Sequence, residues 1–159
     1  MLKWRNMETE KDKIFSEIRE ILQKNRDAQK GFAKAAENAK DQTVKEYFLK
    51  KSADRKDFNE RLFAEIQTGF PNMDIEGSFM GNLHRAWMDV KTLFAGEDDR
   101  SMLNEAIRGD KAAIEEYDDV LDYKTLPVGL SHLLNEQREI IKTDVRNKGS
   151  LEDLKDSVE

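Results

Sequence analysis

The sequence predicts an all-α protein, a bundle of four long helices arranged as two helical hairpins with an additional helix in the crossover connection. Only 2 Pro and 8 Gly occur in 159 residues, and most of them fall at a few places that divide the chain into long segments. Within each segment the apolar residues recur alternately four and three positions apart, which is the period of a helix with one buried face. Charged residues make up 38% of the chain and suit the exposed faces of such helices.

The first predicted hairpin occupies roughly the first seventy residues. Its first helix covers about residues 8–39, and its second begins after the N-cap Asp41 and stops at Gly69-Phe70-Pro71. At about 1.5 Å per residue, each helix is on the order of 40 Å long. The expected inward residues are Ile14, Ile18, Ile21, Asn25, Ala28, Phe32, Ala35 and Ala39, then Val44, Phe48, Arg55, Phe58, Leu62 and Ile66.

The connection after the first hairpin contains a shorter predicted helix. Residues 72–77 are rich in turn formers, and Ser78 is placed to cap a helix over residues 78–94. Its apolar face consists of Phe79, Leu83, Trp87, Val90 and Phe94.

The second predicted hairpin follows Gly96-Glu97-Asp98-Asp99, which caps the third long helix; the fourth opens at Leu126-Pro127. After Gly149, Ser150 with Asp153 resembles a capping box. We therefore divide the chain into a helical bundle over residues 1–147 and a tail over 148–159, which is a short helix or frayed. The inward residues are Leu103, Ala106, Asp110, Ala113, Tyr117 and Val120, then Leu130, Leu134, Gln137, Ile141 and Val145.

Two hairpins joined by one long crossover form the connectivity of ferritin-like bundles. The alternative is a plain up-and-down helical domain. An internal match favours the ferritin-like connectivity, because the polar, Ala and aromatic residues of the first helix recur at the same spacing in the third. The matching positions are Asn25, Ala28 and Phe32, and Asp110, Ala113 and Tyr117.

Composition excludes several classes of function. The formal net charge is −6 with no basic stripe, which argues against nucleic-acid binding, and Cys is absent, which excludes thiolate chemistry. No apolar run approaches the roughly 20 residues of a membrane span, so we expect a cytoplasmic protein. The chain has no Gly-rich phosphate loop and no Ser/His/Asp arrangement, which favours a non-enzyme over a hydrolase or kinase.

The same motifs carry a family resemblance. Lys24-Asn25-x-x-Ala28-x-x-x-Phe32 and Gly109-Asp110-x-x-Ala113-x-x-x-Tyr117 resemble distantly the Gly-Glu-x-x-Ala-x-x-x-Tyr motif of rubrerythrin in the ferritin-like superfamily. Nearly the whole chain is similar to an uncharacterised bacterial family of ferritin-like four-helix-bundle proteins, a domain of unknown function. This resemblance implies the fold and no particular activity. Its marks are Gly31-Phe32-Ala33-Lys34-Ala35-Ala36-Glu37, Gly77-Ser78-Phe79-x-Gly81-x-Leu83-His84-Arg85-x-Trp87 and Arg108-Gly109-Asp110.

The ligands of a ferritin-like di-metal site are missing. Such a site needs a Glu from each of two helices and Glu-x-x-His from each of the other two. Asn25 and Asp110 stand at the first two positions, and neither His84 nor His132 follows a Glu by three residues. We therefore predict no metal and no other cofactor.

A layer of buried polar residues is expected in place of the metal. Each long helix carries one polar residue at an inward position: Asn25, Arg55, Asp110 and Gln137. We expect Arg55 to form charge-assisted hydrogen bonds with Asp110 or with Asp27. In the alternative interpretation the helix phases differ by one step and these side chains reach solvent.

Two features indicate partners. His84-Arg85-x-Trp87 is a candidate anion or partner site, although Trp87 also suits the core of the protein. Apolar residues off the main stripes predict a homo-oligomer, most simply a dimer, formed through second apolar faces of the first two helices. Those residues are Trp4, Phe15, Leu22, Phe63 and Phe70.

The sequence thus favours a non-catalytic bundle that acts through self-association or a protein partner, after loss of a di-metal site. The alternatives are a ferritin-like metal-binding oxidoreductase or metal-storage protein, and a bundle that binds a small ligand in its interior.

Overall fold

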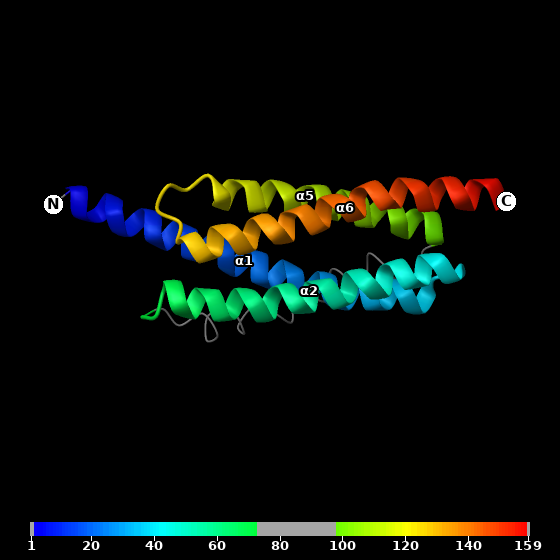
Figure 1. Cartoon of the computed structure of the whole chain (residues 1–159), viewed down its shortest axis with the longest axis horizontal. Coiled ribbons are helices and arrows are strands. Elements are labelled where there is room, and N and C mark those ends of the chain that lie inside the picture. The colour runs from blue at the N-terminus through cyan, green and yellow to red at the C-terminus, as the bar shows by residue number, and fades with distance from the viewer. Residues whose placement is uncertain (1, 73–97, 159) are drawn as a thin grey trace.

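A computed structural model describes the backbone of residues 2–72 and 98–158, and the side chains of residues 10–72, 98–148 and Leu151. These residues form four long helices and no strand: α1 (Leu2–Asn38), α2 (Gln42–Gly69), α5 (Asp99–Leu121) and α6 (Val128–Val158). The helices lie lengthwise beside one another (Figure 1). The prediction of an all-α protein with four long helices is confirmed. The predicted helix over residues 78–94 lies outside the described residues, and so do His84, Arg85 and Trp87.

The helix starts follow from local side-chain chemistry. The Asp41 carboxylate accepts hydrogen bonds from the backbone N–H groups of Thr43 and Val44, at 2.9 and 3.1 Å, and so caps α2. Asp98 caps α5 in the same way by accepting from Ser101 N–H at 2.7 Å. Asp41 is the N-cap that the sequence predicts, and Asp98 lies within Gly96-Glu97-Asp98-Asp99, the stretch predicted to cap the third long helix.

Two predicted boundaries are wrong. α1 begins at Leu2, six residues before the predicted start, and α6 passes through Gly149 to Val158 without the break expected there. A glycine in a helix costs only about 1 kcal/mol. The contacts on both sides of Gly149 offset that cost, because Lys148 is buried and donates to Asn104 at 2.8 Å, and Leu151 packs against the core.

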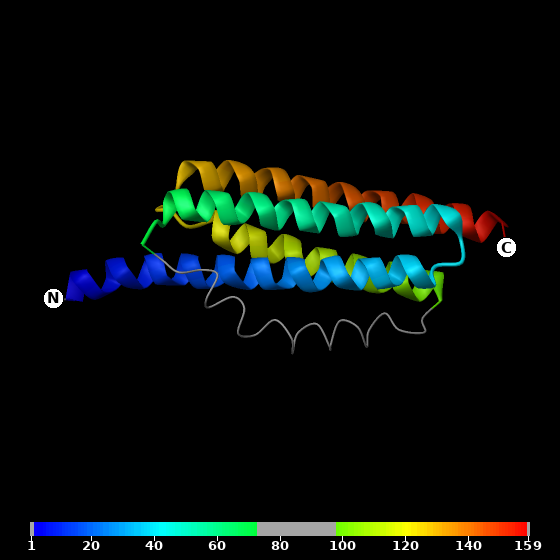
Figure 2. The same cartoon turned by 90° about the horizontal axis from the view of Figure 1, so that it is seen from below.

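Neighbouring helices are antiparallel. Phe15, in the first half of α1, contacts Phe70 at the end of α2, with ring centroids 6.5 Å apart. Tyr47 of α2 bonds to Asp144 of α6, so these two helices also run in opposite directions. Figure 2 also shows α5 running opposite to α6, so α2 and α5 run the same way, and the end of α2 and the start of α5 lie at opposite ends of the bundle.

Asp99 joins the second hairpin to the turn of the first. Its carboxylate, 1% exposed, accepts hydrogen bonds from the backbone N–H groups of Lys40 and Asp41, each at 2.9 Å. These two groups lie in the short turn between α1 and α2. The start of α5 is therefore held against the end of the bundle where that turn lies.

The core consists of two apolar clusters with polar residues between them. One cluster lies around Ile18, Phe58, Tyr117 and Leu134, and the other around Phe32, Phe48, Met102 and Ala106. Along each helix, buried polar or charged residues separate the stretches that contribute to the two clusters. These residues are Asn25, Lys51, Arg55, Asp110 and Asp144.

The second apolar faces predicted on the first two helices are absent from the described residues. Leu22 and Phe70 are buried, and Phe15 and Phe63 pack partly buried against the first core cluster. These residues lie off the main stripes but still contact the core, because the core packs against more than one face of each helix. Trp4 lies where side chains are not described. No helix within the described ranges is long and apolar enough to cross a membrane.

Candidate functional site: a buried polar layer

Arg55 lies inside the bundle and connects three helices. Its Nη1 donates to Asn25 Oδ1 at 3.0 Å and its Nη2 donates to Asp110 Oδ1 at 2.8 Å. The guanidinium carbon also lies 5.6 Å from the centre of the Phe32 ring, in reach of a cation–π interaction. With Arg55 4% exposed and Asp110 fully buried, this is an ion pair removed from solvent.

Lys51 is a second buried cation, one helical turn before Arg55. Its Nζ pairs with Asp110 Oδ2 and, at 3.3 Å, with Asp144 Oδ2, and it lies 4.6 Å from the Phe32 ring centre. Burial lowers the pKa of Lys51, whereas the charge of Asp110 acts in the opposite direction. The group contains two cations and two carboxylates, so the charges of these four side chains balance.

A series of hydrogen bonds continues from the buried ion pairs toward the first core cluster. Asn25 Nδ2 donates to Tyr117 Oη at 3.2 Å, and Tyr117 Oη donates to Gln137 Oε1 at 2.8 Å. Gln137 Nε2 in turn donates to the backbone carbonyl of Phe58 at 3.1 Å. Burial raises the pKa of Tyr117 to about 12, so the phenol stays protonated at neutral pH.

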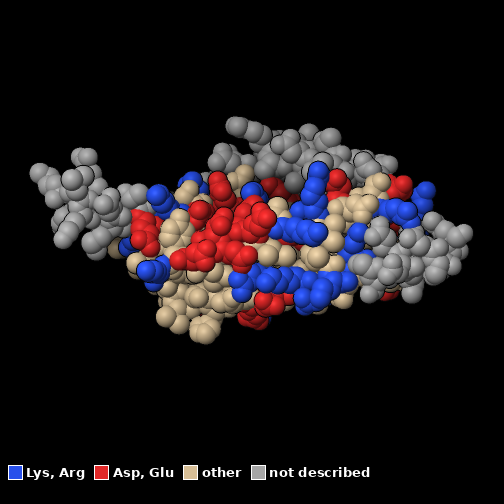
Figure 3. Space-filling view, turned by 90° about the horizontal axis from the view of Figure 1, so that it is seen from above, with Lys and Arg blue, Asp and Glu red and all other residues tan. Residues whose placement is uncertain are grey.

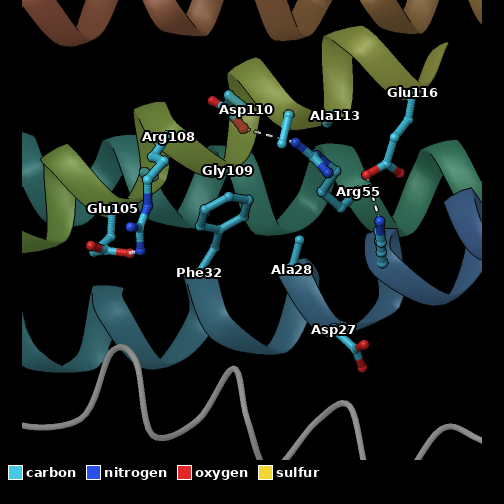
Figure 4. Close-up of a pocket in the computed structure, with 13 residues that line it drawn as sticks. Asp27, Ala28, Phe32, Arg55, Glu105, Arg108, Gly109, Asp110, Ala113 and Glu116 are labelled. Carbon is cyan, nitrogen blue, oxygen red and sulfur yellow. Dashed lines mark hydrogen bonds and ion pairs between the residues drawn. The ribbon is translucent and has the colours of Figure 1, made fainter. Parts of the chain in front are cut away.

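The structure brings Asn25, Arg55, Asp110 and Gln137 into this buried polar layer. Asp27 is also buried, but Figure 4 shows its carboxylate pointing away from Arg55. Asp110, and not Asp27, is therefore the carboxylate that pairs with Arg55.

Sequence reasoning missed Lys51 and Asp144. Their signal was present, because Phe48, Lys51 and Arg55 keep the alternation of three and four residues along α2. In α6 the inward series continues from Ile141 to Asp144, not to the predicted Val145, which is only partly buried. Charged residues are rarely fully buried unless paired, and Lys51 finds its partners Asp110 and Asp144 on other helices, so spacing along one helix does not by itself mark either residue as buried.

Tyr47 holds α6 against this layer. Its hydroxyl donates to the backbone carbonyl of Asp144 at 2.9 Å. Burial, and then the negative charge of Asp110, raise the pKa of Tyr47 above its ordinary value. Tyr47 and Tyr117 therefore act as neutral hydrogen-bond donors at neutral pH.

The layer is suited to holding helices in register. Both Asp110 oxygens are occupied by cations, which makes Asp110 a poor ligand or proton acceptor for anything else. Among the described residues, no group of three or more His, Asp or Glu is arranged to hold a metal ion, and His132 is exposed.

Comparison with known proteins identifies a family. The family model with the description Domain of unknown function (DUF2383) matches residues 13–123, which include most of α1 and all of α2 and α5. No curated protein matches the chain.

Proposed function

The chain belongs to the DUF2383 family, and from this premise we propose that it is a non-catalytic helical bundle acting through self-association or a protein partner. We propose a ferritin-like bundle, distantly related to rubrerythrin, that works in a bacterial cytoplasm and has lost its di-metal site. The helix directions support the ferritin-like part of this proposal, because α2 and α5 run the same way and a long connection joins their opposite ends.

The position of two cations carries the proposal. Ferritin-like metal proteins hold their ions in the bundle core with carboxylates that project inward from facing helices. In this chain the inward carboxylate of α5, Asp110, faces the Lys51 ammonium and the Arg55 guanidinium. A divalent cation in this layer would be repelled by both and would have to displace them from Asp110. We infer that the two side chains stand in the place of the metal.

Metal analysis of the purified protein tests this proposal. We expect protein prepared without chelator, and then incubated with Fe²⁺ or Mn²⁺ and desalted, to retain only background metal. Asp110→Asn and the surface control Asp118→Asn should leave that background unchanged. Near-stoichiometric iron or manganese that Asp110→Asn removes would overturn the proposal and favour the metal-binding oxidoreductase or storage protein.

Charges of both signs on one face suit a protein partner. Figure 3 shows a patch of Asp and Glu left of centre, with Lys and Arg beside and below it. Adjoining patches of opposite sign can complement a protein surface, whereas the acidic patch would repel a phosphate backbone. For self-association we propose a homodimer that covers the start of α1, which projects beyond the end of α2 (Figure 2). A single projecting helix end is marginal in water unless something packs against it.

A further inference from the structure

We propose that a cavity between α1 and α5 binds a small neutral molecule that is mainly apolar and carries one oxygen able to accept a hydrogen bond. The cavity has a volume of about 350 Å³. Figure 4 shows its walls, with Ala28 and Phe32 of α1 on one side, Gly109 and Ala113 of α5 on the other, and Arg55 between them. This proposal goes beyond the proposed function and holds whether the protein is a monomer or a dimer.

The size and lining of the cavity indicate a molecule of about two rings. An apolar cavity of about 150 Å³ is large enough for benzene, and this one has more than twice that volume. Ala28, Phe32, Ala106 and Ala113 supply apolar surface from both helices. Burial of hydrocarbon against this surface provides about 25 cal/mol per Å² of driving force.

Gly109 is solvent-exposed and lies at the edge of the cavity. It lies within α5, where glycine costs about 1 kcal/mol relative to alanine. A Cβ atom built at Gly109 would meet nothing within 4 Å. Packing among the described residues therefore gives no reason for glycine at this position, whereas an occupant of the cavity that approaches the α5 backbone does.

The charges around the cavity favour a neutral occupant. Lys24 pairs with Glu116 across the two helices, and Arg108 pairs with Glu105 along α5. Arg55 is balanced by Asp110, and Asp27, the remaining charged residue of the lining, also has an interaction partner. An ionic molecule would have to separate one of these pairs or bring an unbalanced charge into the site.

Arg55 supplies the polar contact. A guanidinium has five N–H donors, and within the described part of the chain the bonds to Asn25 and Asp110 use two of them. The side chain also lines the cavity. A carbonyl or ether oxygen at that side of the cavity would accept a charge-assisted hydrogen bond from Arg55 without requiring a new charge.

The neutral fluorophore 6-propionyl-2-dimethylaminonaphthalene tests the proposal, because it has two fused rings and one ketone oxygen. We expect saturable binding at one site per chain with a blue-shifted emission. The matched probe 6-propyl-2-dimethylaminonaphthalene, in which CH2 replaces the ketone carbonyl, should bind roughly tenfold more weakly. The anionic probe 8-anilinonaphthalene-1-sulfonate should also bind roughly tenfold more weakly.

Two variants test whether the probe binds in this cavity. Gly109→Leu and Ala113→Met should each fill part of the cavity and weaken binding roughly tenfold or more, whereas the exposed control Ala53→Leu on α2 should leave it unchanged. Gly109→Leu meets open space and removes a helical glycine, so its melting temperature should not fall. Unchanged binding in a folded variant of either kind, absence of saturable binding by the wild type, or tighter binding of the anionic probe would overturn the proposal.

Discussion

Arg55 is the residue on which the polar layer depends most, because it bonds to α1 and α5 from its place on α2. Arg55→Ala leaves the fully buried Asp110 with one cation fewer and Asn25 without its donor. We expect the free energy of unfolding to fall by roughly 3 to 5 kcal/mol, the usual range for breaking a buried pair. Urea denaturation measures this. Lys56→Ala, one residue along and exposed, should change it by no more than about 0.5 kcal/mol; similar effects of the two variants would contradict the burial of the pair.

Tyr117 makes stability fall at alkaline pH. In the unfolded chain the phenol ionises near its ordinary pKa of 10.0, whereas in the folded protein it keeps its proton until about pH 12. Between these values the unfolded state binds fewer protons, so stability decreases as pH rises, by about 1.4 kcal/mol per pH unit for this one group.

Tyr117→Phe isolates that effect. The variant loses the hydrogen bonds to Asn25 and Gln137 at every pH, but it has no phenol to ionise. Other groups, Lys51 among them, titrate in both proteins. Plots of unfolding free energy against pH from 9 to 12 should therefore converge as pH rises. Parallel plots would show that the Tyr117 pKa is not raised by folding.

At the scale of elements, Asp99 at the start of α5 caps the turn between α1 and α2, although the two segments are far apart in the sequence. Asp99 accepts from two backbone N–H groups, and Asp99→Ala removes the acceptor of both. We expect a loss of about 2 to 4 kcal/mol in unfolding free energy, because hydrogen bonds to a charged group are stronger than neutral ones. The neighbouring Asp98→Ala removes the local N-cap of α5 and should cost about 1 kcal/mol. Equal losses would indicate that Asp99 serves only its own helix.

At the scale of the whole molecule, self-association is the prediction that matters most for function. Light scattering at tens of micromolar should report twice the chain mass of 18.5 kDa. Trp4→Glu, in the projecting start of α1, should shift the protein toward the single-chain mass, whereas Lys3→Glu should shift it less because it removes no apolar area. A wild-type particle of 18.5 kDa would contradict the dimer and leave a different protein partner as the proposed route of action.

The sequence by itself determined the number of long helices, the caps at Asp41 and Asp98 and most of the inward stripe, because helical period and N-cap chemistry act over only a few residues. The same period selected Asn25, Arg55, Asp110 and Gln137, all of which the structure buries. Local patterns did not determine that α6 continues beyond Gly149, since the contacts of Lys148 and Leu151 with other helices decide it.

Only the tertiary structure decided the partners within the layer. A lysine on an inward stripe is locally indistinguishable from a lysine whose stem reaches along the surface to water. Lys51 is stable inside because Asp110 arrives from α5 and Asp144 from α6, residues 59 and 93 positions away in sequence. Likewise Leu22 and Phe70 look like surplus apolar surface until neighbouring helices cover them. Burial of a charge is decided by the groups that surround it, and those groups meet only when the helices pack.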